Sequence, residues 1–376
     1  MRKEGLQSIF PIEDINVMGL WELLPHLHKF RSRLREAFEH VQTFRPHAVV
    51  TLDSKGFCFR LLKLLQDSYH FNNVQFNPMH FHYVSPSFWA WKGGEKRLKN
   101  LSNFVDHMLC ILPNEAPVCR FHGISASFVG HPVLEEISEF HEKSNLHQSF
   151  DQEEKVVIPA GALSVSVFPG SRIQEIWRML PIFESALNLL RKSYPNLFVI
   201  IHVAPNKKVE DHIRSSLHEW TVPHVLVPGG NLHLKYDALR MSEVALCTSG
   251  SVALELHLAK LPFVVAYRAH FLTELAIKYK AKISYISLPN ILLDCGVVPE
   301  ALFGSCTPSN LAELLENLIT RKESGERQKH AADKVKELLL PSKSSIHRFK
   351  QSVDIELSTV TPSLLAAFSI LSHVRR

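Results

Sequence analysis

The chain has 376 residues, of which 45% are hydrophobic and 21% are charged, and its formal net charge is +5. This length suits two α/β domains, and this composition is that of a globular protein and not of a disordered one. So small a net charge does not indicate a nucleic-acid-binding surface, and the longest apolar runs fall well short of the roughly 20 residues that span a bilayer.

The six cysteines and 22 histidines show no metal-binding spacing. No Cys-x-x-Cys pair occurs, and several cysteines lie in apolar, strand-like runs, so we expect buried, reduced thiols in a reducing compartment. We expect neither a metal site nor a cofactor. The opening Met-Arg-Lys-Glu-Gly has the pattern of neither a secretory signal nor a transit peptide, so we expect any targeting segment to be absent from this chain.

The first half of the chain alternates helical and strand-like patterns. Apolar residues at positions 27, 30, 34, 38 and 41 share one helical face, and the run at 48–52 predicts a strand with Asp53 at its carboxyl end. The further elements expected here are a helix at about 57–66 and strands at 81–84 and 105–112. Such alternation predicts parallel βαβ units.

The segment at 135–161 is rich in charge and poor in large apolar residues, which predicts a linker between domains. The alternation then resumes. The expected strands are 163–168, 198–203, 224–227, 243–247 and 263–267, and the expected helices are 175–192, about 209–220, 234–241, 252–259 and two or more within 309–340. We expect a complete doubly wound domain, and therefore domains at 1–150 and 151–340, with a C-terminal helix in 341–376 that returns to the first domain.

The Pro-Gly-Ser-Arg sequence at 169–172 lies where a strand passes into a helix. Gly170 allows a close backbone approach, and the N–H groups of Ser171 and Arg172 open the helix toward an anion. The Arg172 guanidinium can also form a fork on phosphate. Taken alone, the Pro-Gly-Ser-Arg sequence is explained equally well as a plain strand-to-helix turn that binds no ligand.

A second turn of the same kind follows at 248–251, where Ser249 and Gly250 begin another helix. Glu255 lies one turn inside that helix, where a carboxylate can accept the hydroxyls of a ribose. It could also simply complement the helix dipole. Two such sites in one domain predict nucleotide binding.

With the stretch 262–268 that ends in Arg268, these turns resemble the donor-binding domain of GT-B glycosyltransferases. Four further stretches resemble the lipid-A-disaccharide synthases. They are 14–20, the Ser-Pro-Ser-Phe-Trp-Ala-Trp string within 82–91, the Phe-Val-Gly-His at 128–131, and 285–290. The string argues against two other GT-B enzymes, a UDP-sugar epimerase and the transferase that adds N-acetylglucosamine to a lipid-linked muramyl peptide.

The resemblance implies an α/β GT-B fold of two Rossmann-like domains that face a cleft. It implies transfer from UDP-2,3-diacylglucosamine to 2,3-diacylglucosamine 1-phosphate, which gives lipid A disaccharide 1-phosphate and UDP. Asp53 then matches the general base for the acceptor 6-hydroxyl, Arg172 a diphosphate ligand and Asn290 a nucleotide ligand. As an alternative, Asp53 merely caps the next helix.

The acceptor side is expected to include Ser85 and Trp89. The basic cluster at 92–99 could meet the acceptor phosphate, although a solvated loop is the simpler interpretation. In the segment 19–35, Trp21 and Leu24 alternate with basic residues, which predicts either contact with an anionic membrane surface or a buried stripe.

The chain departs from the family pattern in lacking a first strand with a glycine-rich loop and a second acid after Asp53. We therefore expect an incomplete first domain and poor stability or activity, and the alternative function is an inactive form that binds only UDP or lipid. The composition resembles the plant organellar branch, which predicts the mitochondrion, with the cytoplasmic face of a bacterial inner membrane as the alternative.

Overall fold

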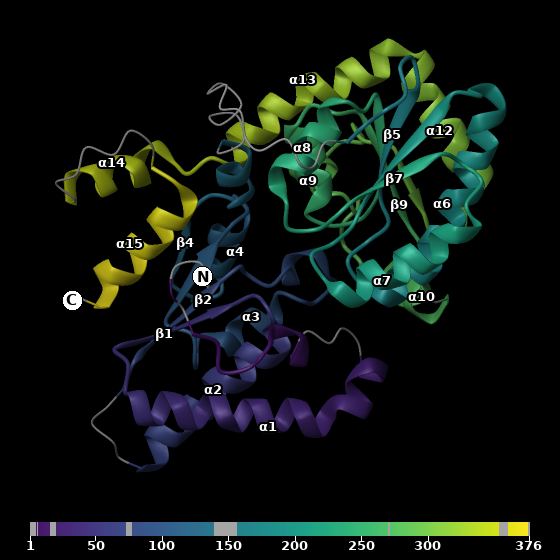
Figure 1. Ribbon diagram of the computed structural model, residues 1–376. Coiled ribbons are helices and arrows are strands. Elements are labelled where there is room, and N and C mark those ends of the chain that lie inside the picture. Colours follow the sequence, from purple (N-terminus) through teal and green to yellow (C-terminus); the bar gives the residue numbers. More distant parts are fainter. Residues whose placement is uncertain are drawn as a thin grey trace. The chain divides into compact units, whose positions relative to one another are not determined.

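The computed structural model describes residues 5, 7–15, 20–72, 77–138, 156–269, 271–352 and 360–374. The chain divides into two compact units. Unit 1 consists of Met1–Pro132 with Leu339–Arg376, and unit 2 of Val133–Leu338. Each unit contains a parallel β-sheet (Figure 1). The expected linker falls largely on residues 139–155, which lie outside the described part.

Unit 1 is built on a four-stranded parallel sheet in the order β1-β2-β3-β4. The strands are β1 (Ala48–Leu52), β2 (Met79–Tyr83), β3 (His107–Cys110) and β4 (Ala126–Phe128). Its first helices are α1 (Leu20–Phe44), α2 (Lys55–Asn72), α3 (Lys96–Leu101) and α4 (Glu115–Phe121). The predicted strands are confirmed to within a few residues, whereas β4 was not anticipated because three residues carry too little periodicity.

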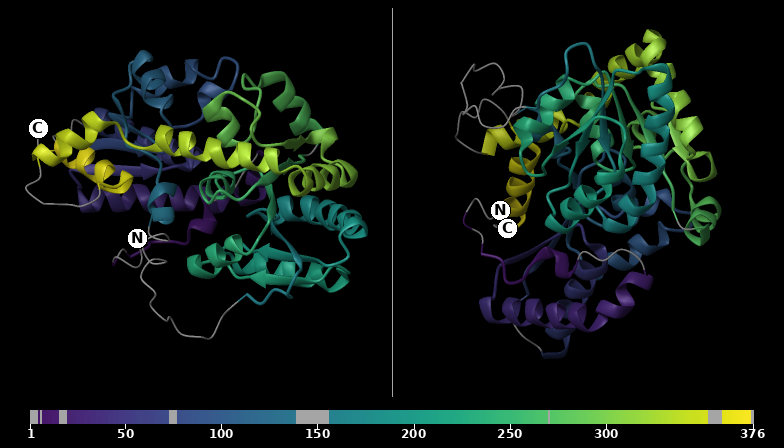
Figure 2. Two further views of the ribbon diagram at one scale, coloured as in Figure 1. Left: turned by 90° about the horizontal axis from the view of Figure 1, so that it is seen from above. Right: turned by 45° about the vertical axis from the view of Figure 1, so that its right-hand side comes forward.

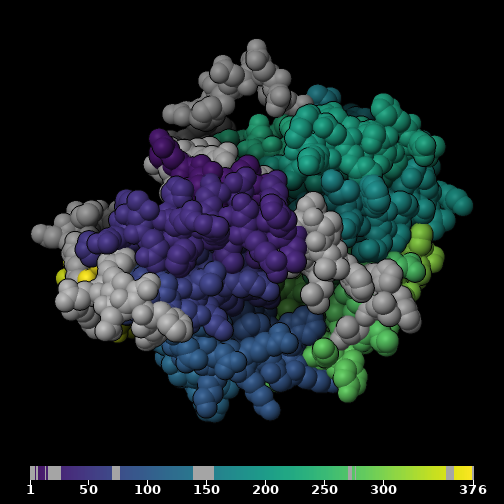
Figure 3. Space-filling view, turned by 90° about the horizontal axis from the view of Figure 1, so that it is seen from below, coloured from purple at the N-terminus to yellow at the C-terminus, as the bar shows by residue number. Residues whose placement is uncertain are grey.

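The long helices of unit 1 bury one face each. On α2 the buried positions Phe57, Leu61 and Leu65 recur every four residues, as the helical period requires. Phe30 of α1 packs edge-on against Phe57 with ring centroids 5.4 Å apart. The opposite faces of α1 and α2 lie at the surface of unit 1, in the purple and dark blue part of Figure 3.

Unit 2 contains a six-stranded parallel sheet in the order β10-β9-β8-β5-β6-β7. Its strands are β5 (Leu163–Phe168), β6 (Leu197–His202), β7 (His224–Val227), β8 (Val244–Thr248), β9 (Phe263–Tyr267) and β10 (Glu300–Leu302). All five residues of β8 are buried. Such continuous burial follows from helices that cover both faces of a parallel sheet.

Helices lie on both faces of this sheet (Figures 1 and 2). They are α6 (Ile173–Ser193), α7 (Lys207–Ser216), α8 (Leu232–Arg240), α9 (Val252–Leu258), α10 (Phe271–Lys280), α11 (Leu288–Leu293), α12 (Pro308–Thr320) and α13 (Lys322–Leu339). The largest core joins α6, α7 and α12 to one face, and a smaller cluster joins α8 to β6 and β7. The doubly wound prediction is confirmed.

The chain ends in α14 (Lys343–Ser352) and α15 (Pro362–Val374), which belong to unit 1. Phe349 and Leu365 from these helices form one buried cluster with Leu109 and Val129 of the sheet region. The Thr361 hydroxyl accepts the N–H of Leu364 and so caps α15. Residues that are far apart in the sequence therefore share a core.

No helix among the described residues is both long and apolar enough to cross a bilayer. All six cysteines are free thiols. Five are buried as expected, but Cys295 is exposed.

Candidate functional site

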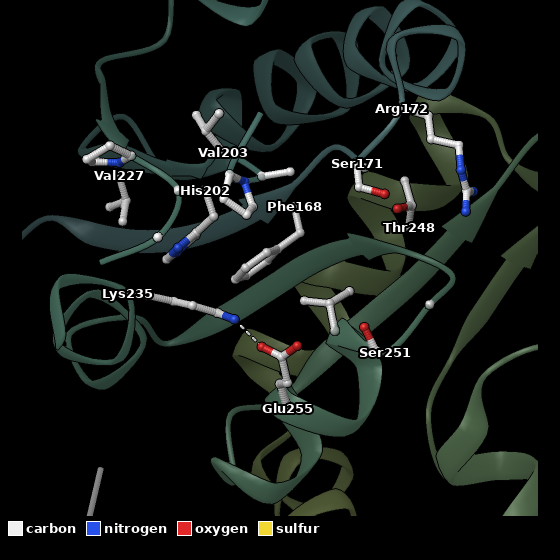
Figure 4. A pocket seen from close by; sticks show the side chains of 18 of the residues that line it. Phe168, Ser171, Arg172, His202, Val203, Val227, Lys235, Thr248, Ser251 and Glu255 are labelled. Carbon is white, nitrogen blue, oxygen red and sulfur yellow. Dashed lines mark hydrogen bonds and ion pairs between the residues drawn. The ribbon is translucent and has the colours of Figure 1, made fainter. Parts of the chain in front are cut away.

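A pocket of about 450 Å³ opens in unit 2 where β5, β6, β7 and β8 end (Figure 4). The carboxyl ends of parallel strands and the first turns of the helices that follow meet there, which is where doubly wound sheets bind ligands. Its lining includes Phe168, Gly170, Ser171, Arg172, Glu175, His202, Lys235, Thr248, Ser249, Gly250, Ser251 and Glu255. The two predicted turns therefore form one site.

The turn at 169–172 is held in shape by an internal carboxylate. Gly170 has φ +120°, and a Cβ at this position would lie 2.4 Å from a carboxylate oxygen of Glu175. The N–H of Ser171 donates to that carboxylate at 3.1 Å. Arg172 is the N-cap of α6, and its exposed side chain lines the pocket. The glycine is thus required because Glu175 approaches the backbone closely, and this internal carboxylate already accepts one of the N–H groups of the turn.

Glu255 lies deeper in the pocket and forms an ion pair with Lys235 of α8, as Figure 4 shows. The two side chains are 13% and 22% exposed, so the pair is largely shielded from solvent. Lys235 contacts one carboxylate oxygen, Oε2, in the described structure, which leaves Oε1 available to a ligand hydroxyl. Lys235 was not predicted, because it comes from a different helix and no local pattern marks it.

The pocket has an aromatic end. The rings of Phe168 and His202 stack with centroids 4.1 Å apart and an interplanar angle of 7°. Burial lowers the pKa of His202 to about 3, and the charge of Lys235 adds to the effect. His202 is therefore neutral near pH 7, and its Nε2 pairs with the Ser166 hydroxyl at 2.9 Å. Figure 4 shows this end opposite the polar groups of Ser171, Arg172 and Thr248.

Two predicted ligands do not line this pocket. The Asn290 side chain is fully buried, and its amide nitrogen donates to Val298 and Glu300 while its oxygen accepts the N–H groups of Val297 and Val298. Because every hydrogen-bonding position of the amide is used, this geometry assigns Asn290 to the fold. Arg268 is exposed, and its guanidinium approaches the Cys306 carbonyl at 3.5 Å.

In unit 1, Asp53 lies at the carboxyl end of β1 with an exposed side chain. Its N–H donates to the Tyr83 carbonyl at 2.9 Å, so it adjoins the end of β2. Asp53, Ser54 and Val84 all have positive φ, of 47°, 21° and 75°. A β-branched residue such as Val84 rarely adopts this conformation, and such strain concentrates at functional edges.

Ser85 and Trp89 face inward. The Ser85 side chain is buried beside Cys119 with Oγ and Sγ 3.7 Å apart, and Trp89 Nε1 donates to the Glu115 carboxylate at 3.4 Å. Burial raises the pKa of Glu115 to about 7, and this outweighs the lowering effect of the N–H donors of Leu112, Trp89 and Ile111. Glu115 was not predicted, since its only signal in the sequence is an acid in the first turn of a short helix.

The predicted membrane segment is only partly described. The side chains of Trp21 and Leu24 lie outside the described set. Phe30, farther along the same stripe, is buried in the unit 1 core, and Lys29 and Arg33 both pair with Asp14. The described part of the segment thus follows the buried-stripe alternative.

Among the residues that the structure describes, no group of three or more His, Cys, Asp or Glu is placed to hold a metal ion.

Comparisons with known proteins agree with this geometry. The family model for lipid-A-disaccharide synthetase matches residues 1–353. The chain is 55% identical over 384 residues to a probable mitochondrial lipid-A-disaccharide synthase of Arabidopsis thaliana, with 100% of this chain and 83% of the relative covered. It is 33% identical over 366 residues to the lipid-A-disaccharide synthase of Rhodospirillum centenum, with 97% and 86% covered.

Solved structures give the same fold. A UDP-GlcNAc 2-epimerase from Neisseria meningitidis bound to UDP-GlcNAc has a TM-score of 0.53 at 14% identity, with 89% of this chain and 86% of that chain covered. A complex of S. aureus MnaA with UDP has a TM-score of 0.54 at 12% identity, with 92% and 86% covered. At these identities the likeness shows the GT-B fold alone.

Proposed function

The chain belongs to the lipid-A-disaccharide synthase family of UDP-sugar glycosyltransferases, and from this premise we propose its reaction and the residues that perform it. The chain joins UDP-2,3-diacylglucosamine to 2,3-diacylglucosamine 1-phosphate and releases UDP. The single observation that carries the donor half is the pocket of unit 2, in which the turns at Gly170 and Gly250 meet around Glu255.

The pocket offers complementary groups for each part of UDP. Arg172 is exposed, and no ion pair involves it within the described part of the chain, so its guanidinium is available to the diphosphate. The second oxygen of Glu255 can accept a ribose hydroxyl. The Phe168–His202 stack supplies a flat, uncharged surface at the far end, which suits a pyrimidine base.

On the acceptor side, Asp53 is the general base. Its carboxylate takes the proton of the acceptor 6-hydroxyl while that oxygen attacks the anomeric carbon of the donor, and the bond to UDP breaks. Exposure keeps the Asp53 carboxylate accessible, and its left-handed backbone lies at the carboxyl edge of the sheet. Ser85 and Trp89 support this edge from inside through Cys119 and Glu115. No finding favours the inactive alternative.

Both proposed substrates carry acyl chains, so we place the reaction at a membrane surface to which the protein binds peripherally. The mitochondrion is the proposed compartment, since the relative from Arabidopsis thaliana is named as mitochondrial.

The test is transfer by the purified full chain from the UDP-sugar to the phosphorylated acceptor in detergent micelles, with the disaccharide identified by mass spectrometry. Asp53→Asn should lower kcat about 10²- to 10⁴-fold, the usual contribution of a general base, and leave UDP affinity unchanged. Asp67→Asn, on the exposed part of α2, is the matched control. If the wild type binds UDP but forms no disaccharide, the proposed reaction is wrong.

A further inference from the structure

Two cationic side chains of unit 1 lie near the same aromatic ring. The Lys55 ammonium lies 5.8 Å from the centroid of the Phe88 ring, and the Arg97 guanidinium carbon lies 5.8 Å from the same centroid. The three residues come from separate segments: the start of α2, the 3-10 helix Phe88–Ala90, and α3. The tertiary fold, and not local sequence, creates this cluster.

Neither cation has a carboxylate partner. Among the described residues, no ion pair within 4.0 Å includes Lys55 or Arg97, and both side chains are exposed. The basic residues of α1 behave differently, since Lys29 and Arg33 share Asp14. Even Asp53, two residues before Lys55, does not pair with it. The positive charge of the cluster is therefore not neutralised by the described part of the protein.

Like charges gathered at one ring repel each other, and an anion placed near both relieves that repulsion. A guanidinium forms a planar fork of donors, and an ammonium acts as a compact charge. Together they suit a phosphate group with several free oxygens. Cation–π attraction to the Phe88 ring restrains both charged groups, which lowers the entropy lost when such an anion binds.

The cluster also lies beside the candidate general base. Lys55 follows Asp53 by two residues at the end of β1, and Phe88 follows Ser85 by three residues after β2. Strands β1 and β2 pair directly and run parallel, so the segments that follow them, with Lys55 and Phe88, leave the same edge of the sheet. The diphosphate of the donor already has its own ligands in unit 2, which leaves a second phosphate for this edge.

We infer that Lys55 and Arg97 bind the phosphomonoester of the lipid-sugar acceptor and select acceptors that carry it. This rests on the proposed function, because it presumes a phosphorylated acylated glucosamine as the acceptor. The phosphate on C1 and the CH2OH group on C5 flank the ring oxygen of one sugar, so the phosphate and the 6-hydroxyl lie near each other. Binding of the former at the cluster then holds the latter toward Asp53.

The experiment measures equilibrium binding of the full chain to neutral detergent micelles that carry one of three lipids: diacylglucosamine 1-phosphate, unphosphorylated diacylglucosamine, or phosphatidic acid. The third lipid offers the same phosphomonoester without the sugar. Wild type should bind the first at least about 10-fold more tightly than the unphosphorylated sugar, which is the order expected for charged hydrogen bonds. It should also bind the first more tightly than phosphatidic acid, which lacks the sugar hydroxyl that faces Asp53. Equal binding of phosphatidic acid would overturn the inference in favour of a general anionic-lipid contact.

Lys55→Met and Arg97→Met should each reduce the preference for the phosphorylated sugar, and the double variant should lose it, a change of about 10- to 100-fold. Lys63→Met on α2 is the matched control at an exposed position and should keep it. Lys55→Arg keeps the charge and should retain most of the preference. UDP affinity and the unfolding midpoint show that each variant is folded.

The two proposals fail in different ways. If disaccharide forms but the double variant still prefers the phosphorylated acceptor, the phosphate site is wrong and the reaction stands. If wild type forms no disaccharide but loses its phosphate preference on double substitution, the site stands and the reaction is wrong. If wild type shows no preference for the phosphorylated sugar, the site is overturned whatever the reaction.

Discussion

The Glu175 carboxylate accepts the backbone N–H of Ser171 at 3.1 Å, within the turn that is open to the unit 2 pocket. A side-chain oxygen thus stands where an oxygen of a bound diphosphate would meet the same amide. The contact satisfies an N–H near the helix start and complements the positive end of α6. It also places a negative charge where the proposed ligand brings its own.

We therefore expect Glu175→Gln to raise UDP affinity. Removal of one charge within a few ångströms of the diphosphate should strengthen binding about 10-fold, since such a pair at a protein surface repels by roughly 1–4 kcal/mol. Uridine has no diphosphate, so its affinity should not change. Calorimetry with both ligands checks this, and Glu184→Gln on the same helix is the control. A weaker affinity for UDP would mean that Glu175 mainly holds the turn in shape.

Glu255 should distinguish ribose from deoxyribose. Wild type should bind 2′-deoxy-UDP about 10-fold more weakly than UDP, because the free oxygen of Glu255 loses a hydroxyl partner. In Glu255→Gln the two ligands should bind more nearly alike. Competition binding measures both constants, with Glu210→Gln on α7 as control. An unchanged ratio between the two ligands in the variant would remove Glu255 from the ribose site.

Asn290→Ala should destabilise the fold and leave the pocket intact. The substitution leaves the buried N–H groups of Val297 and Val298 without a hydrogen-bond acceptor. Each such group lowers the stability of the fold by about 1–3 kcal/mol. Denaturant unfolding should therefore show a loss of roughly 2–6 kcal/mol in the free energy of unfolding. The folded protein should bind UDP as wild type does. A selective loss of UDP affinity at unchanged stability would instead restore Asn290 to the nucleotide site.

Glu115 should make stability depend on pH. Burial raises its pKa from 4.5 to about 7, so the folded state holds the proton more tightly than the unfolded state. Its contribution is then most favourable below pH 4.5, declines as pH rises toward 7, and is constant above that, a change of roughly 3 kcal/mol. Glu115→Gln mimics the protonated form. The stability difference between wild type and variant, measured from pH 5 to 8, should show this decline, and a flat difference would contradict it.

Much of the fold followed from pattern alone. The strands that begin near residues 48, 163 and 244 were predicted to within a residue or two, because buried parallel strands are short apolar runs between turn signals. The elements missed were short ones such as β4 and β10, which have three residues each and owe their pairing to neighbouring strands. The two turns at Gly170 and Gly250 were also predicted from sequence. Glycine and serine directly after an apolar strand are typical of a turn that leads into a helix.

The Pro-Gly-Ser-Arg turn and the tryptophan string were enough, as sequence, to indicate the family and the class of reaction. Only the tertiary structure paired Glu255 with Lys235, set Glu175 against Ser171, buried Asn290 away from the pocket, and brought Lys55 and Arg97 to Phe88. The physical reason is the range of the interactions. Turn geometry and helix starts depend on a few consecutive residues, whereas ion pairs, burial and charge clusters depend on side chains that the chain brings together from distant elements.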